Sequence, residues 1–352
     1  MTFIRSIGTA VPEKSFTQRE CWEALQRARR PELTPRTRAV LQGILNHDNG
    51  IERRSLALDR LDDCFDIDPD TLNRRFVKHA PALASAAARQ ALARAGLEAR
   101  EVDGLVVSTC TGYLCPGLTS YVAEALGTRP NALLLDLVGQ GCGAALPNLR
   151  TAHALLESQG CEHVLSVCVE VCSAAFYLDN DLGVLVSACL FGDGAAAALV
   201  SARPGEGERR VRFKAARSIT APEHRDALRF EQKNGMLRNI LTLPVPKLAA
   251  DHAGRVLDEL LAEQEVPREA IAGWVLHAGG RKVLEELRWR LGLDEDATRL
   301  SAVVLREYGN LSSPFVLFVL DSALREKTTP GLWWMSSFGA GFSCHGALLE
   351  VA

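Results

Sequence analysis

One of the ten cysteines, Cys142, stands among small residues in the stretch LVGQGCGAAL, residues 137–146. Glycines at positions 139, 141 and 143 permit a sharp turn after an apolar run and leave the thiol uncrowded. A helix is expected to follow, with Pro147 in its first turn. A thiol at a helix N-terminus is expected to have a lowered pKa and to act as a nucleophile. A small residue buried in a tight turn is the alternative that this stretch alone leaves open.

A cysteine nucleophile needs a basic or cationic partner, and His277 is the best placed of the eight histidines. It ends a predicted buried strand and precedes a Gly-Gly turn, where side chains project into clefts. Asn310 follows Tyr-Gly in another turn, and its amide could donate to a thioester oxygen as that oxygen becomes negative. Alone, each would more often be a satisfied core histidine or a turn asparagine. Together with Cys142 they indicate acyl transfer through a thioester.

The elements expected to position these residues alternate between helices and buried strands. The predicted helices cover 17–30, 33–47, 71–96, 117–126 and 143–158, and the predicted strands cover 102–110, 132–139 and 163–173. Gly96 is expected to end the long alanine-rich helix. This alternation is typical of an α/β layered fold.

Two matches in the same order indicate an internal duplication. VDGLVVST (102–109) is similar to IAGWVLHA (271–278), and the FGDG that begins at Phe191 is similar to the FGAG that begins at Phe338. The polar region 201–235 is expected to contain the link between the halves. The predicted division is therefore a half over 1–205 that carries the cysteine and a half over 206–352 that carries the histidine and the asparagine.

The composition argues against several classes of protein. The net charge is −3, and the one basic cluster, at 209–214, is small and interrupted, so a solvated strand or loop edge is favoured over a nucleic-acid site. No apolar run reaches the roughly 20 residues that span a bilayer. The first residues predict a strand and turn rather than a signal peptide. The cysteine spacing fits reduced thiols in the cytoplasm, and the C-x₄-C and C-x₃-C pairs lack the histidines of a metal site.

Five stretches carry a resemblance to a known family: DLVGQGCGAALPNL, SACLFGDGAAAALV, WVLHAGGRKVLEEL, EYGNLSSPFVLFVLD and SSFGAGFSCHGALLE. In order and separation they resemble the chalcone synthase-like (type III) polyketide synthases of bacterial type. These are homodimeric ketosynthases of the thiolase fold, so the resemblance implies two duplicated halves in an α-β-α-β-α arrangement. It covers the chain from about residue 3 to the C-terminus.

The resemblance also implies a mechanism. Cys142 would carry an acyl group as a thioester, and His277 and Asn310 would hold the carbonyl of a malonyl-type extender while it loses carbon dioxide. The resulting enolate would attack the acyl group in a Claisen condensation. The glycines around Cys142 would give the thioester and the enolate room to meet. Phe191 matches the gatekeeper between substrate tunnel and cavity; a core aromatic is its alternative reading.

Other residues fall where the family binds substrate. Several are small, which suggests room for a long or branched acyl chain unless other substitutions refill the space. Ala175 replaces a threonine, Leu243 replaces an aromatic residue, and Ser337 and Ala340 alter the cavity loop. Cys115 matches a residue that reaches across the dimer interface, although it could be a buried loop thiol. The implied substrate-binding positions are Phe191, Cys110, Thr111, Cys115, Cys172, Ala174, Ala175, Ser187, Leu243 and Ser312.

The positions that grip coenzyme A phosphates in the family are not basic here: they align with Leu41, Ile44 and Asp48. Arg53 and Arg54 could replace them or form a solvated face. Acyl groups could instead arrive on a carrier protein, whose phosphopantetheine arm lacks the 3′-phosphate.

The expected activity is an iterative polyketide synthase that uses acyl-CoA and malonyl-CoA and has no cofactor or metal. Its product would be a resorcinol, a phloroglucinol, a chalcone-like compound or a pyrone. A ketosynthase that makes one condensation, on CoA-bound or carrier-bound chains, is the alternative. A thioester hydrolase is favoured less, and a non-catalytic binding subunit least.

Overall fold

The computed structural model describes residues 1–28, 30, 32–158, 160–205, 209–326 and 328–352. The strands are β1 (Thr2–Ala10), β2 (Ser15–Thr17), β3 (Arg53–Ser55), β4 (Gly104–Thr109), β5 (Leu133–Val138), β6 (His163–Glu170), β7 (Gly194–Ser201), β8 (Val211–Thr220), β9 (Leu228–Lys233), β10 (Met236–Leu241), β11 (Ile271–Leu276), β12 (Gly331–Gly339) and β13 (Ser343–Val351). The α-helices are α1 (Gln18–Ala28), α2 (Pro35–Asn46), α3 (Pro69–Ala95), α4 (Leu118–Leu126), α5 (Ala145–Ser158), α6 (Leu182–Leu190), α7 (Val245–Glu263), α8 (Arg281–Leu291), α9 (Arg299–Tyr308) and α10 (Phe315–Arg325).

Nine of the described strands form one sheet in the order β11-β12-β13-β8-β1-β7-β6-β4-β5. In the first half, β1 pairs antiparallel with β7, β7 antiparallel with β6, and β6 parallel with β4. In the second half, β8 pairs antiparallel with β13, β13 antiparallel with β12, and β12 parallel with β11. The same sequence of pairings therefore occurs twice, which confirms the internal duplication. Antiparallel pairing of β1 with β8 joins the two halves.

The region expected to contain the link, 201–235, is more structured than its polar composition predicts. It holds β8, whose side chains are half-buried or buried along most of its length, and β9. The chain passes between the halves after β7 ends at Ser201 and before β8 begins at Val211. Residues 206–208 of the expected link lie outside the described residues, as does residue 29 of the first expected helix.

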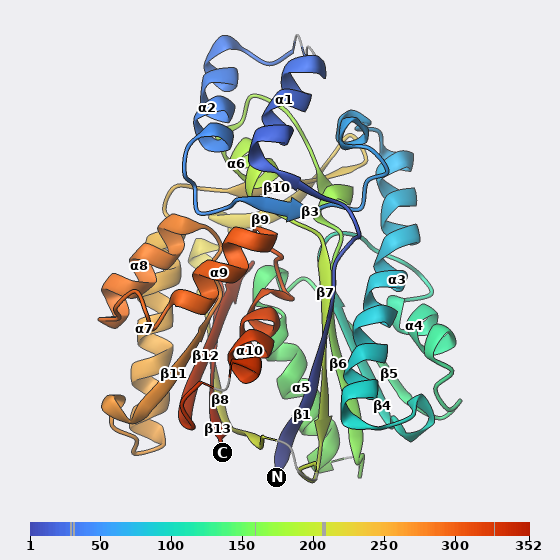
Figure 1. Cartoon of the computed structure of the whole chain (residues 1–352), viewed down its shortest axis with the longest axis vertical. Helices are drawn as coiled ribbons and strands as arrows, with labels where there is room; N and C mark the ends of the chain where they lie inside the picture. The colour runs from blue at the N-terminus through green and yellow to red at the C-terminus, as the bar shows by residue number, and fades with distance from the viewer. Residues whose placement is uncertain (29, 31, 159, 206–208, 327) are drawn as a thin grey trace.

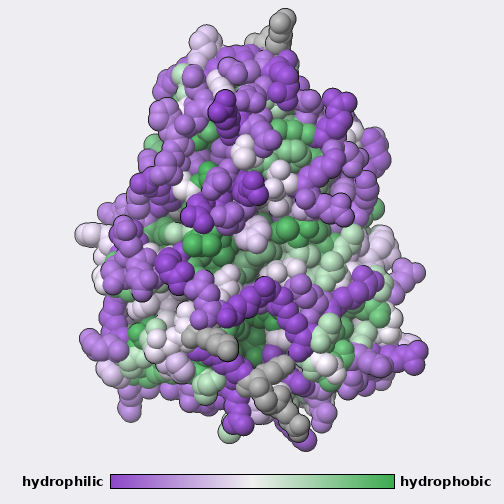
Figure 2. Space-filling view, in the orientation of Figure 1, coloured by the Kyte–Doolittle hydropathy of each residue, from purple (hydrophilic) through white to green (hydrophobic). Residues whose placement is uncertain are grey.

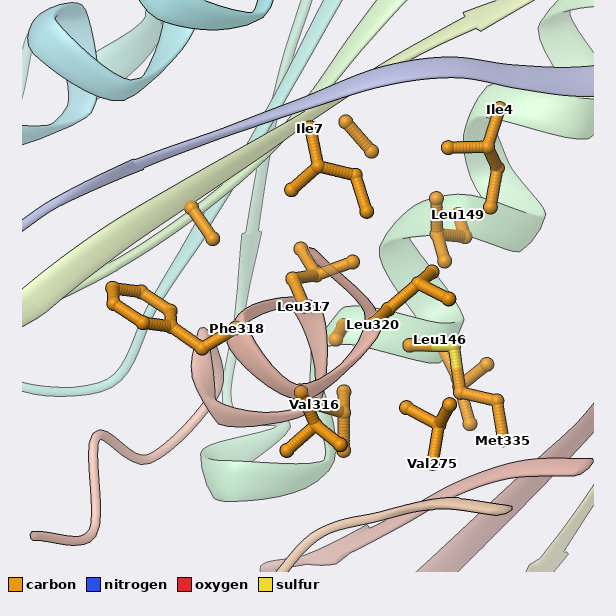
Figure 3. Packing of buried hydrophobic residues seen from close by; sticks show 14 of the residues in the cluster. Ile4, Ile7, Leu146, Leu149, Val275, Val316, Leu317, Phe318, Leu320 and Met335 are labelled. Carbon is orange, nitrogen blue, oxygen red and sulfur yellow. The ribbon is translucent and has the colours of Figure 1, made fainter. Parts of the chain in front are cut away.

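Helices lie on both outer faces and between the halves (Figure 1). α5 and α10 occupy the middle, α3 and α4 cover the first half, and α7 and α8 cover the second, which gives the predicted α-β-α-β-α order. The central core packs α5 and α10 against strands of both halves, as Figure 3 shows for Leu146, Leu149 and Leu317 with Ile7 and Met335. Burial of such side chains is the main favourable contribution to folding.

Helix α3 illustrates how the sequence sets one of these contacts. Asp68 accepts hydrogen bonds from the backbone N–H groups of Asp70 and Thr71 at the start of the helix, and Gly96 ends it with φ of 65°. Its alanine face lets the sheet approach closely: a Cβ at Gly8 of β1 would lie 2.1 Å from the Ala87 carbonyl oxygen. The long alanine-rich helix predicted from the sequence is therefore packed directly on the sheet.

Above the sheet, α1, α2 and α6 form a smaller layer around their own apolar cluster, with the two-stranded sheets β2-β3 and β9-β10 below them. The surface over α1 and α2 is largely hydrophilic, whereas apolar residues gather around the middle of the same face (Figure 2). Within the described chain, no helix is both long and apolar enough to cross a membrane.

Candidate active site

Cys142 lies in a single 3₁₀ turn, Gly141–Gly143, between β5 and α5. Gly141 has φ of 56°, a conformation that favours glycine. A Cβ on Gly143 would lie 3.1 Å from the backbone nitrogen of Gly339, the last residue of β12. Ser337 Oγ also donates to the Gly143 carbonyl oxygen at 3.0 Å. These two glycines therefore allow the close packing of two chain segments, and Gly141 also borders a small space of about 10 Å³ beside Cys142.

The expected lowering of the Cys142 pKa is wrong. The side chain is buried, and desolvation raises the pKa of its thiol to about 12. A hydrogen bond from Ser312 Oγ, 3.3 Å from Sγ, offsets only part of this effect. Helix α5 begins at Ala145, after the 3₁₀ turn that holds Cys142. The resting site therefore contains a neutral thiol, and a thiolate needs a partner that takes its proton.

His277 follows the last residue of β11, as the sequence predicted, and its backbone N–H donates to the Ser336 carbonyl. Its ring packs edge-on against Phe315 and Phe338, with centroids 5.1 and 5.0 Å away. Neither ring nitrogen has a hydrogen-bond partner among the described residues. Burial lowers the pKa of this imidazole to about 3, so the resting ring is neutral and one nitrogen is free to accept a proton.

Asn310 lies between α9 and α10, and two hydrogen bonds fix how its amide points. Its Oδ1 accepts from the Ser312 backbone N–H at 2.8 Å, and its Nδ2 donates to the Gly279 carbonyl at 3.1 Å. Because an amide nitrogen carries two hydrogens, one N–H is left to donate to a ligand. The Asn310 backbone is bridged to Phe191, which brings the expected gatekeeper beside it.

A cavity of about 410 Å³ brings these residues together from both halves of the chain. Cys142, His277, Asn310, Phe191 and Phe338 all line it. We call it the outer cavity. Its other lining residues include Gly43, Ile44, Asp48, Asn49, Leu243, Pro246, Arg281 and Lys282. The exposed residues among them, Gly43, Asp48, Leu243, Arg281 and Lys282, surround its mouth. A nucleophile, a neutral base and an amide donor facing one space can form and transfer a thioester.

On the other side of Phe191 lies a much smaller space of about 10 Å³, which we call the inner cavity. The expected residues Thr111, Cys172, Ala175, Ser187 and Ser312 line it together with Phe176, Phe230 and Asn239, which the sequence did not indicate. The room expected from the small side chains is therefore refilled by two phenylalanines and an asparagine. Phe230 and Asn239 face each other across the β9-β10 pair.

The structure separates four expected substrate residues from the inner cavity. Ala174 is packed in the apolar core between α3 and the first half of the sheet. Leu243 is 93% exposed and lines the mouth of the outer cavity, and Cys115 is exposed on the loop before α4. Cys110 contacts Glu170 and Ser312 instead.

Glu170 is a buried acidic residue beside the site that the sequence analysis did not single out. It is fully buried at the end of β6, and burial raises the pKa of its carboxyl group. Hydrogen bonds from the Cys110 backbone N–H, Thr111 Oγ1 and Ser313 Oγ favour its charged form and offset part of this rise. Ser312 Oγ lies 3.4 Å from Glu170 Oε1 and 3.3 Å from Cys142 Sγ. The carboxyl group therefore helps to fix the position of the hydroxyl group that contacts Cys142. A single acidic residue at the end of an otherwise apolar strand was the available signal.

Arg54, one candidate for holding coenzyme A phosphates, has a structural role. It is buried, and its Nη1 donates to the carbonyl oxygens of Ala188 and Phe191 at 2.8 and 2.9 Å. The guanidinium therefore holds the segment that carries Phe191 and is not free to bind a phosphate. Arg53 is exposed on β3 and does not line the outer cavity.

Asp193 fixes the same segment, and its removal is expected to destabilise the protein. Its carboxylate accepts from the backbone N–H groups of Ser173 and Ala57 and from Ser173 Oγ, at 2.5 to 2.8 Å. Asp193→Ala leaves two buried N–H donors without partners, so the free energy of unfolding should fall by about 3 kcal/mol in urea titrations. Asp226→Ala, at an exposed ion pair, should change it by less than about 0.5 kcal/mol. Equal stability of the two variants would contradict this role.

Comparisons with known proteins show similarity over nearly the whole chain. The family model of the N-terminal domain of chalcone and stilbene synthases matches residues 1–204, and the model of their C-terminal domain matches residues 215–350. The chain is 32% identical to the 3,5-dihydroxyphenylacetyl-CoA synthase of Streptomyces toyocaensis, covering 99% of this chain and 89% of the relative. It is also 32% identical to the synthase of that name from Amycolatopsis orientalis, covering 99% and 94%.

Two similar solved structures cover nearly the whole fold. PKS-I from the brown alga Ectocarpus siliculosus is 26% identical with a TM-score of 0.92, covering 100% of this chain and 98% of that one. The 1,3,6,8-tetrahydroxynaphthalene synthase of Streptomyces coelicolor, a bacterial type III polyketide synthase, is 27% identical with a TM-score of 0.89, covering 99% of each chain.

Proposed function

The chain belongs to the chalcone and stilbene synthase family, the type III polyketide synthases, and from this premise we propose that it condenses malonyl-CoA units into a resorcinol-type product. The observation that carries the proposal is the convergence of Cys142, His277 and Asn310 on one cavity. The relatives named above are 3,5-dihydroxyphenylacetyl-CoA synthases, and a 3,5-dihydroxyphenyl group is a resorcinol ring. The substrates enter as thioesters, and the proposed reaction needs no metal or cofactor.

The first step loads Cys142. Its sulfur attacks the thioester carbonyl carbon while its proton passes to the free nitrogen of His277, since burial disfavours a free thiolate. The bond from carbon to the leaving sulfur breaks, and the departing thiolate takes the proton back from His277. The acyl group is then bound to Cys142, and the imidazole is neutral again.

The second step uses His277 and Asn310 as donors. The malonyl thioester oxygen accepts hydrogen bonds from a ring N–H of His277 and from the free N–H of Asn310. The bond to the carboxylate breaks, carbon dioxide leaves, and its electron pair forms an enolate whose oxygen these donors stabilise. The enolate carbon attacks the acyl carbonyl, a C–C bond forms, and the bond from the acyl carbon to the Cys142 sulfur breaks. The departing thiolate takes up one proton from the solvent, which restores the neutral thiol. Repetition of both steps lengthens the chain.

The small inner cavity supports a short product. A chain growing from Cys142 past Phe191 meets Phe176, Phe230 and Asn239, which leave space of only about 10 Å³. A long alkyl starter would need these side chains to move, at a cost typical of overpacked interiors. A starter no larger than the extender unit is therefore proposed.

Phe230→Ala is expected to lengthen the products. Phe230 borders both the inner cavity and the small space beside Cys142, so its loss opens volume where the growing chain must fold. Mass spectrometry of the products should show additional two-carbon units or larger accepted starters, with total turnover reduced about two- to tenfold because the intermediate is held less well. Phe230→Met, which keeps most of the volume, should retain the wild-type products. An unchanged product pattern in Phe230→Ala would contradict this assignment.

The function is tested by incubating the purified protein with labelled malonyl-CoA, alone and with a panel of acyl-CoAs, and identifying the products by mass spectrometry. Release of carbon dioxide together with an aromatic product from malonyl-CoA alone is expected. A product of one condensation would favour the alternative ketosynthase, and hydrolysis without C–C bond formation would favour a thioester hydrolase. Malonyl groups accepted only from carrier proteins would overturn the proposed use of coenzyme A.

The proposed assembly is a homodimer through the edge strand β5. Leu133, Leu134, Leu135 and Val138 expose 39 to 59% of their surface, an apolar strand edge that proteins usually cover. The loop with Cys115 leads into α4, whose Thr119 hydrogen-bonds to Asp136 of β5, so this exposed thiol belongs to the same surface. The ten free cysteines support a cytoplasmic location for the enzyme.

Leu134→Lys is expected to convert the dimer into a monomer, because it introduces a charge into the proposed contact. Light scattering at micromolar concentration should give about half the mass of the wild type. Trp289→Lys, also on an exposed apolar residue but on α8, should leave the mass of the dimer unchanged. A monomeric wild type, or a dimeric Leu134→Lys variant, would contradict the interface.

A further inference from the structure

The mouth of the outer cavity lacks cations on the side where the family pattern predicts them. Ile44 and Asp48 line it, Leu41 is buried in the apolar cluster of α1, α2 and α6, and Arg54 is held by carbonyl oxygens. Asp48 is itself bound by Arg281 of α8, with 2.8 Å between its Oδ2 and Nη1. The cations available to a phosphate at this mouth are therefore those of α8 and the neighbouring α9.

A second cavity of about 460 Å³, which we call the arginine groove, runs between α8 and α9. It shares Asp48 and Arg281 with the outer cavity, so the two spaces meet at the mouth. In Figure 1 these two helices lie together below α2. Four arginines line the groove against three carboxylates: Arg281, Arg288, Arg299 and Arg306, with Asp48, Glu285 and Glu295.

The arginines retain donors for a ligand. Arg281 pairs with Asp48 and Glu285, Arg288 with Glu295, and Arg299 with Asp296 and Glu326. Their side chains are 31 to 50% exposed. A guanidinium carries five N–H donors, and its carboxylate partners use only some of them. These pairs hold the guanidinium groups in place, so less side-chain entropy is lost when a phosphate binds.

Lys282 supplies a further cation where the two cavities meet. It is exposed at the start of α8 and lines the outer cavity. No ion pair or hydrogen bond to its ammonium group occurs within the described part of the chain. The same cavity contains the buried, unpartnered nitrogens of His277, which are the expected target of the substrate's other end.

We propose that the arginine groove binds the 3′-phosphoadenosine diphosphate end of coenzyme A thioesters, with Lys282 at the diphosphate and the pantetheine arm reaching Cys142 through the outer cavity. This inference rests on the proposed function and names the carrier of its substrate. The groove has the volume of an ordinary ligand site. Its several arginines suit a ligand with three phosphates, since guanidinium groups bind phosphate through paired N–H donors. A carrier protein's arm, with one phosphodiester, would leave the groove unfilled.

The test compares malonyl-CoA with malonyl-pantetheine, which has the same thioester but no nucleotide. Lys282→Ala and Arg288→Ala should each raise the KM for malonyl-CoA about five- to tenfold while changing the KM for malonyl-pantetheine less than about twofold. Lys78→Ala on α3 and Arg255→Ala on α7 are matched controls, and Arg255 is likewise held by a carboxylate. Equal KM changes for both thioesters, or no change for either, would overturn the proposal.

A binding measurement separates this inference from the proposed function. Adenosine 3′,5′-bisphosphate should bind the wild type in calorimetry and bind Lys282→Ala and Arg288→Ala at least about fivefold more weakly. If the wild type binds this nucleotide but forms no polyketide, the proposed function fails and the groove assignment stands. If polyketide forms and the nucleotide does not bind, the groove assignment fails alone. A wild type that prefers a malonyl carrier protein, with its KM raised in these variants, would make the groove a protein-docking surface and overturn the proposal.

Discussion

Replacing Cys142 by alanine is expected to abolish acyl loading and to lower polyketide formation by a factor on the order of 10⁵ or more, as loss of a nucleophile does in other enzymes that use covalent catalysis. Cys142 is the one cysteine that lines the outer cavity together with His277 and Asn310. No other thiol can therefore take its place without moving the chain. Intact-protein mass spectrometry after incubation with acyl-CoA measures loading, and product analysis measures turnover.

The same variant should still decarboxylate malonyl-CoA. His277 and Asn310 remain to hold the thioester oxygen, and the enolate they stabilise then takes a proton from water instead of attacking an acyl group. Cys189→Ala is the matched control, because burial also raises the pKa of the Cys189 thiol to about 12. That residue lies in the apolar cluster of α1, α2 and α6 and does not line the outer cavity. An acyl group found on a different cysteine of Cys142→Ala would contradict the assignment of the nucleophile.

The elements around the site could be predicted because their signals are local. Alternating apolar strands and helices, the Gly96 helix end and the alanine-rich pattern of α3 all depend on residues close in sequence. The duplication was visible in two short matches, since equivalent strands of the halves meet similar environments. The sequence left the start of β8 open between a solvated strand and a loop edge. Its polar ends and nearby turn residues resemble those of a loop, while its pairing with β1 and β13 comes from distant segments.

The properties of the site depended on burial, which no local pattern reports. A glycine-rich turn before a helix predicts a lowered cysteine pKa, but desolvation by the surrounding chain raises it instead. Small residues at aligned positions predicted a spacious cavity, yet Phe230 arrives from the β9-β10 pair and fills it. Arg54 looked like a surface cation until the fold placed carbonyl oxygens around it. In each case the deciding neighbour lies far away in the sequence.

Asn310→Asp is expected to lower the rate of malonyl-CoA decarboxylation about 10²- to 10³-fold, the usual effect of losing one donor to a developing negative charge. The substitution keeps the shape of the side chain, and one oxygen can still accept from the Ser312 backbone N–H. The atom that replaces Nδ2 faces the Gly279 carbonyl. If the new carboxyl group is protonated, this carbonyl takes its only O–H; if it is ionised, it repels the enolate. Neither state leaves a donor for the substrate.

The donor role is separated from a structural one by measuring loading and decarboxylation in parallel. Asn310→Asp should retain acyl loading of Cys142 to within about tenfold, because the thiol and the base His277 are untouched. Carbon dioxide release is best measured in the Cys142→Ala background, because no condensation consumes the enolate there. Asn239→Asp in the inner cavity is the matched control, since it makes the same exchange at a buried asparagine that does not line the outer cavity. Decarboxylation at the wild-type rate in Asn310→Asp would show that His277 holds the enolate oxygen without this amide.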